Sequence, residues 1–86
     1  MTTKTPVASY TRELLGGEVS ISVYHSHGAP DHSCYYARAS HLIQATGMGP
    51  YFTSAHGSSP EDVMYRWDSL MGNMAKQPGA ELRPMS

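Results

Sequence analysis

The residues with the most reactive side chains lie close together in the sequence. His25, His27, His32 and Cys34 form the spacing H-x-H-x(4)-H-x-C. Zinc accepts imidazole and thiolate ligands, and His25 and His27 are spaced to share one face of a strand. A hairpin could bring all four side chains together, so they are the candidate metal ligands. The spacing matches no common zinc module, and no CxxC or HxxxH pair accompanies it. We therefore expect polar loop histidines and no cofactor.

Cys34 also has the chemistry of a thiol nucleophile. Such a site requires a base, an orienting group and oxyanion donors, and no local pattern of this kind surrounds Cys34. Gly47, Met48 and Gly49 are similar to the start of a phosphate-binding loop, but a third glycine and a directly following helix are missing. We expect a protein that is not an enzyme, with Cys34 as a small half-buried side chain and the glycines in a turn.

Tyrosines are concentrated in segments that are predicted to be extended, namely Tyr24, Tyr35, Tyr36 and Tyr51. A small core cannot supply a hydrogen-bond partner for so many buried hydroxyl groups. Some of these tyrosines must therefore be exposed, and exposed tyrosine with arginine is typical of the centre of a protein interface. Arg38 lies beside Tyr24 and Tyr36 on the predicted outer face. We expect these five residues to contact a partner, with Tyr24, Tyr36 and Arg38 as the main contacts.

The elements that position these side chains begin with a helix over residues 59–75. At about 100° per residue, its apolar side chains fall within about 120° of arc. Ser59 can cap the free amides, Pro60 suits the first helical position, and Glu61 and Asp62 lie at the positive end of the helix dipole. The apolar face consists of Val63, Met64, Trp67, Leu70, Met71 and Met74. This pattern predicts a helix that covers a sheet and contributes its methionines to the core.

A period of two replaces the helical period from Glu18 onward. Apolar and polar side chains alternate there, with Val19, Ile21 and Val23 on one face and Ser20, Ser22 and Tyr24 on the other. Residues 34–40 form a second extended run. The short loop between the two runs contains Gly28 and Pro30, which favours an antiparallel hairpin.

A short helix is predicted over residues 6–15. Val7, Tyr10 and Leu14 recur at helical spacing between a proline and a pair of glycines. The alternative is an extended arm, because so short a segment does not hold a helix without packing.

The remaining segments are short. Residues 41–46 either continue the second strand or start another, and residues 51–55 are predicted to form a short strand. Residues 56–58 are interpreted as a polar loop and residues 80–86 as a tail. The predicted fold is α+β with the order α-β-β-β-α, or β-β-β-α if the first helix does not form. In both cases a small antiparallel three-stranded sheet is covered on one face by the C-terminal amphipathic helix, which leaves the other face available to a partner.

Composition limits the class of protein. The chain of 86 residues is expected to form one domain, 1–86, with loose ends at about 1–5 and 78–86. It is 40% hydrophobic with a net charge of −1, and its basic residues are scattered, so no patch is expected to attract a phosphate backbone. With a single cysteine, no signal peptide and no run of about 18 apolar residues, we expect a cytoplasmic location and no membrane contact.

Two family resemblances rest on local patterns. The order α-β-β-β-α, with residues 28–32 between strands and residues 57–59 before the last helix, resembles a double-stranded RNA-binding domain in outline. That family carries a lysine-rich motif at the start of its final helix, where it grips phosphates. Here residues 59–62 read Ser-Pro-Glu-Asp, so the charge at this position is reversed. Strands followed by this helix are also similar to the partly degraded RNase H-like antitoxins of the HicB type.

The whole chain is similar in style to phage-encoded inhibitors of bacterial defence, anti-CRISPR proteins above all, although no diagnostic motif is shared. This resemblance implies a non-enzymatic protein from a phage or mobile element that acts in the cytoplasm of the host bacterium, where it sterically blocks a bacterial defence nucleoprotein complex. The near-neutral charge implies contact by shape and aromatic side chains. The alternatives are nucleic-acid binding through the sheet tyrosines, a HicB-type antitoxin, or a metal-dependent function. A homodimer formed by an edge strand is compatible with each of these alternatives.

Overall fold

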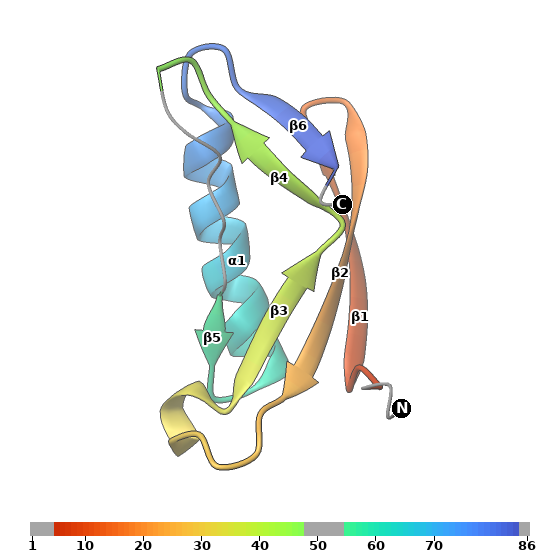
Figure 1. Ribbon diagram of the computed structural model, residues 1–86, viewed down its shortest axis with the longest axis vertical. Coiled ribbons are helices and arrows are strands. Elements are labelled where there is room, and N and C mark those ends of the chain that lie inside the picture. The colour runs from red at the N-terminus through yellow and green to blue at the C-terminus, as the bar shows by residue number, and fades with distance from the viewer. Residues whose placement is uncertain (1–4, 48–54, 85–86) are drawn as a thin grey trace.

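The computed structural model describes residues 5–47 and 55–84. Two antiparallel sheets lie against one long helix, α1 (Pro60–Ala75), as Figure 1 shows. The larger sheet has the strand order β1 (Ala8–Leu14), β2 (Gly17–His25), β3 (Tyr35–Ala39) and β5 (His56–Gly57). The smaller sheet pairs β4 (His41–Gln44) with β6 (Glu81–Pro84), and a 3-10 helix, η1 (Asp31–Ser33), lies between β2 and β3. The predicted α+β class with an antiparallel sheet and a C-terminal helix is confirmed.

Helix α1 begins and packs as its sequence predicts. The Ser59 side chain accepts a hydrogen bond from the Asp62 amide at 3.1 Å, which satisfies one of the free amides of the first turn, and Pro60 follows the cap. The apolar residues of the predicted face are buried apart from Leu70, which is 36% exposed. Trp67 lies at the centre of the core, only 1% exposed.

The β2 strand divides its side chains between two environments. Val19, Ile21 and Val23 are buried against α1 together with Ala37 of β3 and Ile43 of β4. The intervening side chains lie on the opposite face. The antiparallel β2–β3 hairpin predicted from the alternation is confirmed, with Val23 opposite Ala37.

The predicted N-terminal helix is wrong, because this segment forms β1. Exposure alternates along the strand, and Ala8, Tyr10 and Leu14 pack against the core. Tyr10 and Leu14 are four residues apart, a spacing that places two side chains on one side of a strand as well as of a helix. A two-residue turn at Leu15 and Gly16, both with positive φ (51° and 79°), pairs β1 with β2 as a tight hairpin. The packing available to a paired strand outweighs the weak helical preference of so short a segment.

The chain passes from the larger sheet to the smaller one at Ser40. Its amide donates to the Ser20 carbonyl at 2.8 Å, and its hydroxyl accepts from the Ser20 amide at 3.0 Å. The Ser40 side chain thus supplies the acceptor that a continuing strand would offer from its backbone. The next residues are released from β2, and His41 begins β4.

The predictions of a C-terminal tail and of a three-stranded sheet are both wrong. Residues 81–84 form β6, whose Leu82 lies opposite Ile43 of β4 and packs against the core. A Cβ at Gly17 would lie 2.7 Å from Leu82 Cδ1, so glycine there lets β6 approach the first hairpin. The described residues therefore form a four-stranded and a two-stranded sheet. The predicted strand over residues 51–55 lies almost entirely outside the described residues.

Candidate functional site

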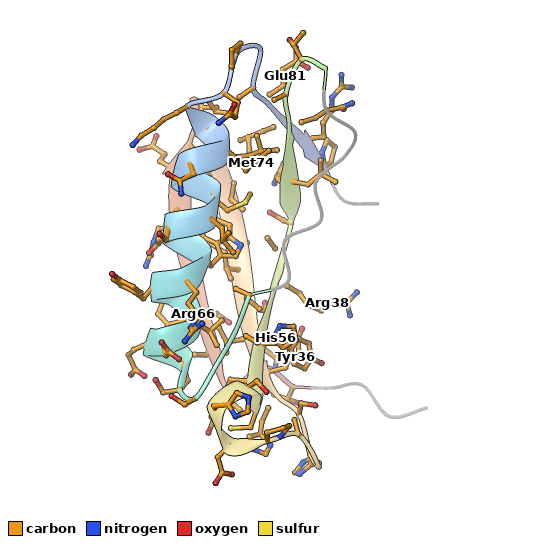
Figure 2. All side chains as sticks on the ribbon, turned by 90° about the vertical axis from the view of Figure 1, so that its left-hand side faces the viewer. Tyr36, Arg38, His56, Arg66, Met74 and Glu81 are labelled. Carbon is orange, nitrogen blue, oxygen red and sulfur yellow. The ribbon has the colours of Figure 1, made fainter. Side chains whose placement is uncertain are left out.

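The sheet face opposite α1 carries a row of aromatic side chains from three adjacent strands. Tyr24 of β2 lies opposite Tyr36 of β3, and Tyr36 lies opposite His56 of β5. The Tyr24 and Tyr36 rings are stacked, with centroids 5.5 Å apart and planes at 23°. The Tyr36 and His56 centroids are 6.3 Å apart with planes at 38°. We call these three residues the aromatic ridge, and Figure 2 shows Tyr36 and His56 on the side of the sheet away from α1.

Sheet geometry explains why the aromatic ridge forms. Residues directly opposite one another on neighbouring strands project from the same face with their Cβ atoms about 4.5–5.5 Å apart. Tyr24 follows the alternation that buries Val19 and Val23, so its side chain must point to the open face. Both tyrosines are half-buried, which leaves part of each ring at the surface. Stacking of aromatic pairs contributes about 0.5–1.5 kcal/mol beyond their burial, so the ridge is ordered before any partner binds.

Arg38 supplies the positive charge beside the ridge. It lies two residues after Tyr36 on the same face, opposite Ser22, and it is exposed. Its guanidinium makes no ion pair or hydrogen bond with any residue in the described ranges 5–47 and 55–84. The acidic side chains of this face, Glu13 and Glu18, lie opposite one another near the β1–β2 turn, at the far end of the sheet. The face therefore has a cationic aromatic end and an acidic end.

One of the five predicted contact residues, Tyr35, is not part of this surface. Tyr35 projects to the other face of the sheet, where it packs against the core and meets His25 at a centroid distance of 5.0 Å. Tyr51 lies outside the described residues. Tyr24, Tyr36 and Arg38 are brought together as their sequence positions predict.

The candidate metal ligands lie on β2 (His25), in the turn after it (His27), on η1 (His32) and directly after η1 (Cys34). The His25 and His27 rings meet edge to face at 4.8 Å, His32 is exposed on η1, and the Cys34 thiol donates to the Asp31 carbonyl at 3.4 Å. Within residues 5–47 and 55–84, no group of three or more histidine, cysteine, aspartate or glutamate side chains is placed to hold a metal ion. The proximity of these residues in sequence does not become a shared site.

Comparisons with protein-family models, curated proteins and solved structures find no match. The α-β-β-β-α order, which carried the outline resemblance to a double-stranded RNA-binding domain, is absent from the described part of the chain because β1 replaces the first helix. In the same ranges, no helix is long and apolar enough to cross a membrane. The arrangement of side chains is therefore the basis for any functional conclusion.

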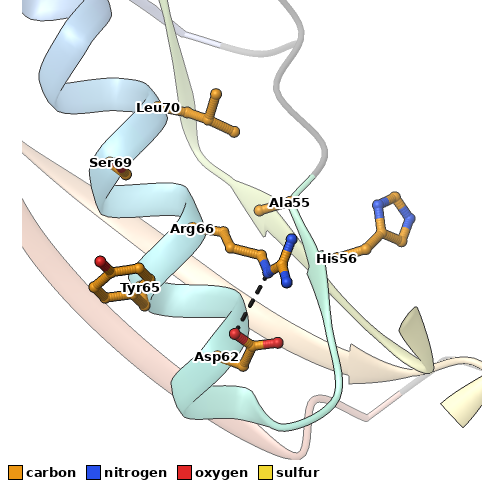
Figure 3. Close-up of a pocket in the computed structure, with 7 residues that line it drawn as sticks. All are labelled: Ala55, His56, Asp62, Tyr65, Arg66, Ser69 and Leu70. Atoms are coloured by element: carbon orange, nitrogen blue, oxygen red, sulfur yellow. Dashed lines mark hydrogen bonds and ion pairs between the residues drawn. The ribbon is translucent and has the colours of Figure 1, made fainter. Parts of the chain in front are cut away.

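A groove of about 520 Å³ lies between β5 and the exposed side of α1, as Figure 3 shows. Arg66 and Asp62 form an ion pair along the helix side of the groove, with Nε and Oδ1 3.4 Å apart. The other carboxylate oxygen of Asp62 accepts from the Ser58 amide at 3.0 Å. That hydrogen bond, with a smaller contribution from Arg66, lowers the pKa of Asp62. Asp62 thus holds the residue before the N-cap against the first turn of the helix.

His56 and the groove were missed in the sequence prediction. Residues 56–58 were interpreted as a polar loop, but His56 and Gly57 pair with β3. Two residues cannot display a period, so alternation gave no signal. The signal in the sequence was a glycine just before the helix, at Gly57, because glycine often marks a close approach of two backbones. A Cβ there would lie 2.7 Å from Asp62 Oδ2 and 2.9 Å from the Val63 amide nitrogen. Glycine lets this strand pass directly under the start of α1.

Proposed function

We propose that this chain is a binding protein whose open sheet face docks onto a partner protein through the aromatic ridge and Arg38. One observation carries the proposal: a stacked, cross-strand aromatic row lies beside an exposed guanidinium on the face opposite the helix. Tyrosine and arginine are the residue types that most often dominate the energy of protein interfaces. The ridge holds its tyrosines in place, which reduces the entropy lost on binding.

The orientation of the rings favours a protein partner over single-stranded nucleic acid. A base stacks on an open aromatic face. The Tyr24 and Tyr36 rings stack on each other, so each directs one face at the other, and His56 lies at a tilt of 38° beside Tyr36. A base could not stack on the faces that the two tyrosines share, whereas tyrosine rings and hydroxyl groups suit apolar contacts and hydrogen bonds with a protein surface.

The charges of the face define what the partner must offer. Arg38 requires a carboxylate, which a guanidinium can bind with two parallel hydrogen bonds. The partner surface should therefore combine an acidic side chain with an apolar area that accepts the tyrosine edges. The biological setting that we propose is the steric blocking of a bacterial defence nucleoprotein complex by a phage or mobile-element protein. A function that consists of occupying a surface is consistent with this small chain and its net charge of −1.

The test is capture of partners from bacterial lysate by the tagged protein, with and without nuclease, followed by mass spectrometry and a binding assay with the protein that is recovered. The variant Y24A/Y36A/R38A should bind this partner at least about 100-fold more weakly, because each interface anchor contributes on the order of 2 kcal/mol. Its matched control is Y65A/R83A, which also removes an exposed tyrosine and an arginine but leaves the ridge intact. Thermal unfolding should show that both variants remain folded.

The proposal is supported if the partner survives nuclease, is lost with the ridge variant and is retained with the control. Equal binding by the folded ridge variant would show that this face is not the interface. Loss of all partners after nuclease, with affinity that falls steeply as salt rises, would instead assign the face to nucleic acid.

A further inference from the structure

The β1 strand lies at an edge of the larger sheet. It pairs with β2 along its whole length, and no other described strand pairs with it. The pairing is continuous and has no change of register from Ala8, opposite Val23, to Leu14, opposite Gly17. Figure 1 shows the strand on the outer side of the hairpin, away from α1. An edge strand of this kind offers a row of amide and carbonyl groups to another strand.

The tight turn determines which groups face outward. Because Leu14 and Gly17 close a two-residue turn, they form a hydrogen-bonded pair, and the pairs alternate from there along the ladder. The even-numbered residues of β1 therefore direct their amides and carbonyls toward β2. Ser9, Thr11 and Glu13 direct theirs outward, so three residues with evenly spaced backbone groups are available for pairing.

Two exposed apolar side chains flank this edge. Val7 is 54% exposed immediately before β1, and Leu15 is 46% exposed immediately after it. They are equidistant from Thr11 along the chain. Neither is a residue of the strand itself, because the Val7 amide donates to the Val23 carbonyl at 2.8 Å and Leu15 lies in the turn. If two copies of β1 paired antiparallel about a two-fold axis at Thr11, the strand end that follows Val7 would lie beside the turn of the other copy that contains Leu15. The same axis would place Ser9 opposite Glu13, with no like charges directly facing each other.

We propose that β1 pairs with the β1 strand of a second copy, with Thr11 at the two-fold axis. The exposed Val7 of one copy and Leu15 of the other then lie at the same end of the seam, and the outward backbone groups of Ser9, Thr11 and Glu13 are satisfied. Helix α1 packs mainly against β3, β4 and β5, so the helices of the two copies lie away from the new seam. The proposal selects a second copy as the occupant because the symmetric spacing of Val7 and Leu15 about Thr11 fits a two-fold partner.

Arg12 is compatible with this arrangement. Its Nη1 donates to the Thr11 carbonyl at 3.0 Å, while its Nε bonds to Asp68 of α1 at 3.1 Å. A carbonyl oxygen has two lone pairs, so the Thr11 carbonyl can also accept an amide from the second copy. Its position also places Arg12 opposite Tyr10 of that copy, within reach of the aromatic ring as in the contact at 5.7 Å that it makes within its own chain.

Pairing of the two β1 strands does not depend on the proposed function of the aromatic ridge, but a dimer would enlarge the binding surface. A two-fold axis at an edge joins two sheets into one continuous sheet and leaves equivalent faces on the same side. Both aromatic ridges would then face in one direction, at the two ends of a wider surface. Such a dimer would engage two copies of a repeated partner subunit with increased avidity.

The primary test is the mass of the purified protein in solution over a wide range of concentrations, by light scattering or sedimentation. Each chain has a mass of 9.4 kDa, and the proposal predicts a species of twice that mass. The variant T11P removes the outward amide at the axis and should raise the dimer dissociation constant at least about 10-fold, whereas T11S keeps the amide and should leave it unchanged. A protein that is monomeric throughout the range, or a T11P variant that dimerises normally, would overturn the proposal.

Two further variants test the register and remain informative if T11P does not fold. S9K places a cation opposite Glu13 of the second copy and should tighten the dimer about two- to fivefold, while S9E should weaken it by a similar factor. In a C34S background, T11C should form a disulfide across the axis, and S20C, on the neighbouring strand, should not. Equal effects of S9K and S9E, or equal cross-linking of the two cysteine variants, would exclude the proposed register. None of these results depends on whether a partner binds the ridge.

Discussion

The two faces of the β2 strand differ in almost every property although their residues alternate along one short segment. Val19, Ile21 and Val23 are at most 1% exposed and contact the helix side of the sheet. Ser20, Ser22 and Tyr24 point to the other side, where the described structure places no helix. Packing against α1 restricts which side chains the first face can carry, and the proposed partner restricts the second face. Substitutions on the first should therefore alter stability, and substitutions on the second should alter binding.

The largest effect that separates the two environments is expected at Trp67. The variant W67A removes the largest fully buried side chain and should lower the free energy of unfolding by about 3–5 kcal/mol. Y65A, on the exposed side of the same helix, should change it by less than about 0.5 kcal/mol. Urea unfolding monitored by circular dichroism measures both. Similar losses in the two variants would mean that α1 does not cover the sheet with the face described here.

An intermediate effect is expected where β5 meets α1. G57A would force a Cβ to within 3.0 Å of the Asp62 side chain and the Val63 amide, and should destabilise the protein by about 1–3 kcal/mol. G72A is the matched control, because a Cβ built at this helical position has no atom within 4 Å apart from its chain neighbours and the nearby backbone of its own helix. It should stabilise the protein by about 0.5–1 kcal/mol. Thermal melts of the two variants should therefore shift in opposite directions, and a shared direction would contradict the close approach of β5 to α1.

The smallest effect concerns the charge of Asp62. The Ser58 amide lowers the pKa of Asp62 from its ordinary value of 3.8, so the carboxylate stabilises the folded state at any pH above that value. This contribution is lost as the pH falls below 3.8 and through the lower pKa of the folded state. D62N should be slightly less stable than the natural sequence at neutral pH, and the difference should vanish in strong acid. A stability difference that stays constant down to the lowest pH would show that shape, not charge, is responsible.

The elements with long, unambiguous periods could be predicted from the sequence. The helix over residues 59–75 and the strand from Glu18 carry several residues per face, so a single odd residue does not obscure the pattern. The segment around Tyr10 and Leu14 was misassigned because a four-residue spacing fits both a helix and a strand, and tertiary pairing decided between them. Of residues 81–84, only Leu82 is partly buried, so the local sequence contains no alternation that would distinguish β6 from a tail.

The candidate site was predictable to the same extent. Tyr24, Tyr36 and Arg38 could be assigned to one face because two alternating runs in a hairpin determine which side chains are neighbours. Tyr35 was included only for its residue type, and the alternation places it on the covered face. His56 could not be found in this way, because its place in the ridge depends on the pairing of β3 with β5, which lie far apart in the sequence.

The Ser40 hydroxyl has a consequence for residues well away from it. A slip of β3 by two residues along β2 would preserve the separation of apolar and polar faces, so burial alone does not forbid it. That slip would, however, remove Ser40 from Ser20 and leave the Ser20 amide without its side-chain acceptor. It would also move Tyr36 away from Tyr24. A hydroxyl group at one end of the hairpin thus favours the alignment in which the two tyrosines meet.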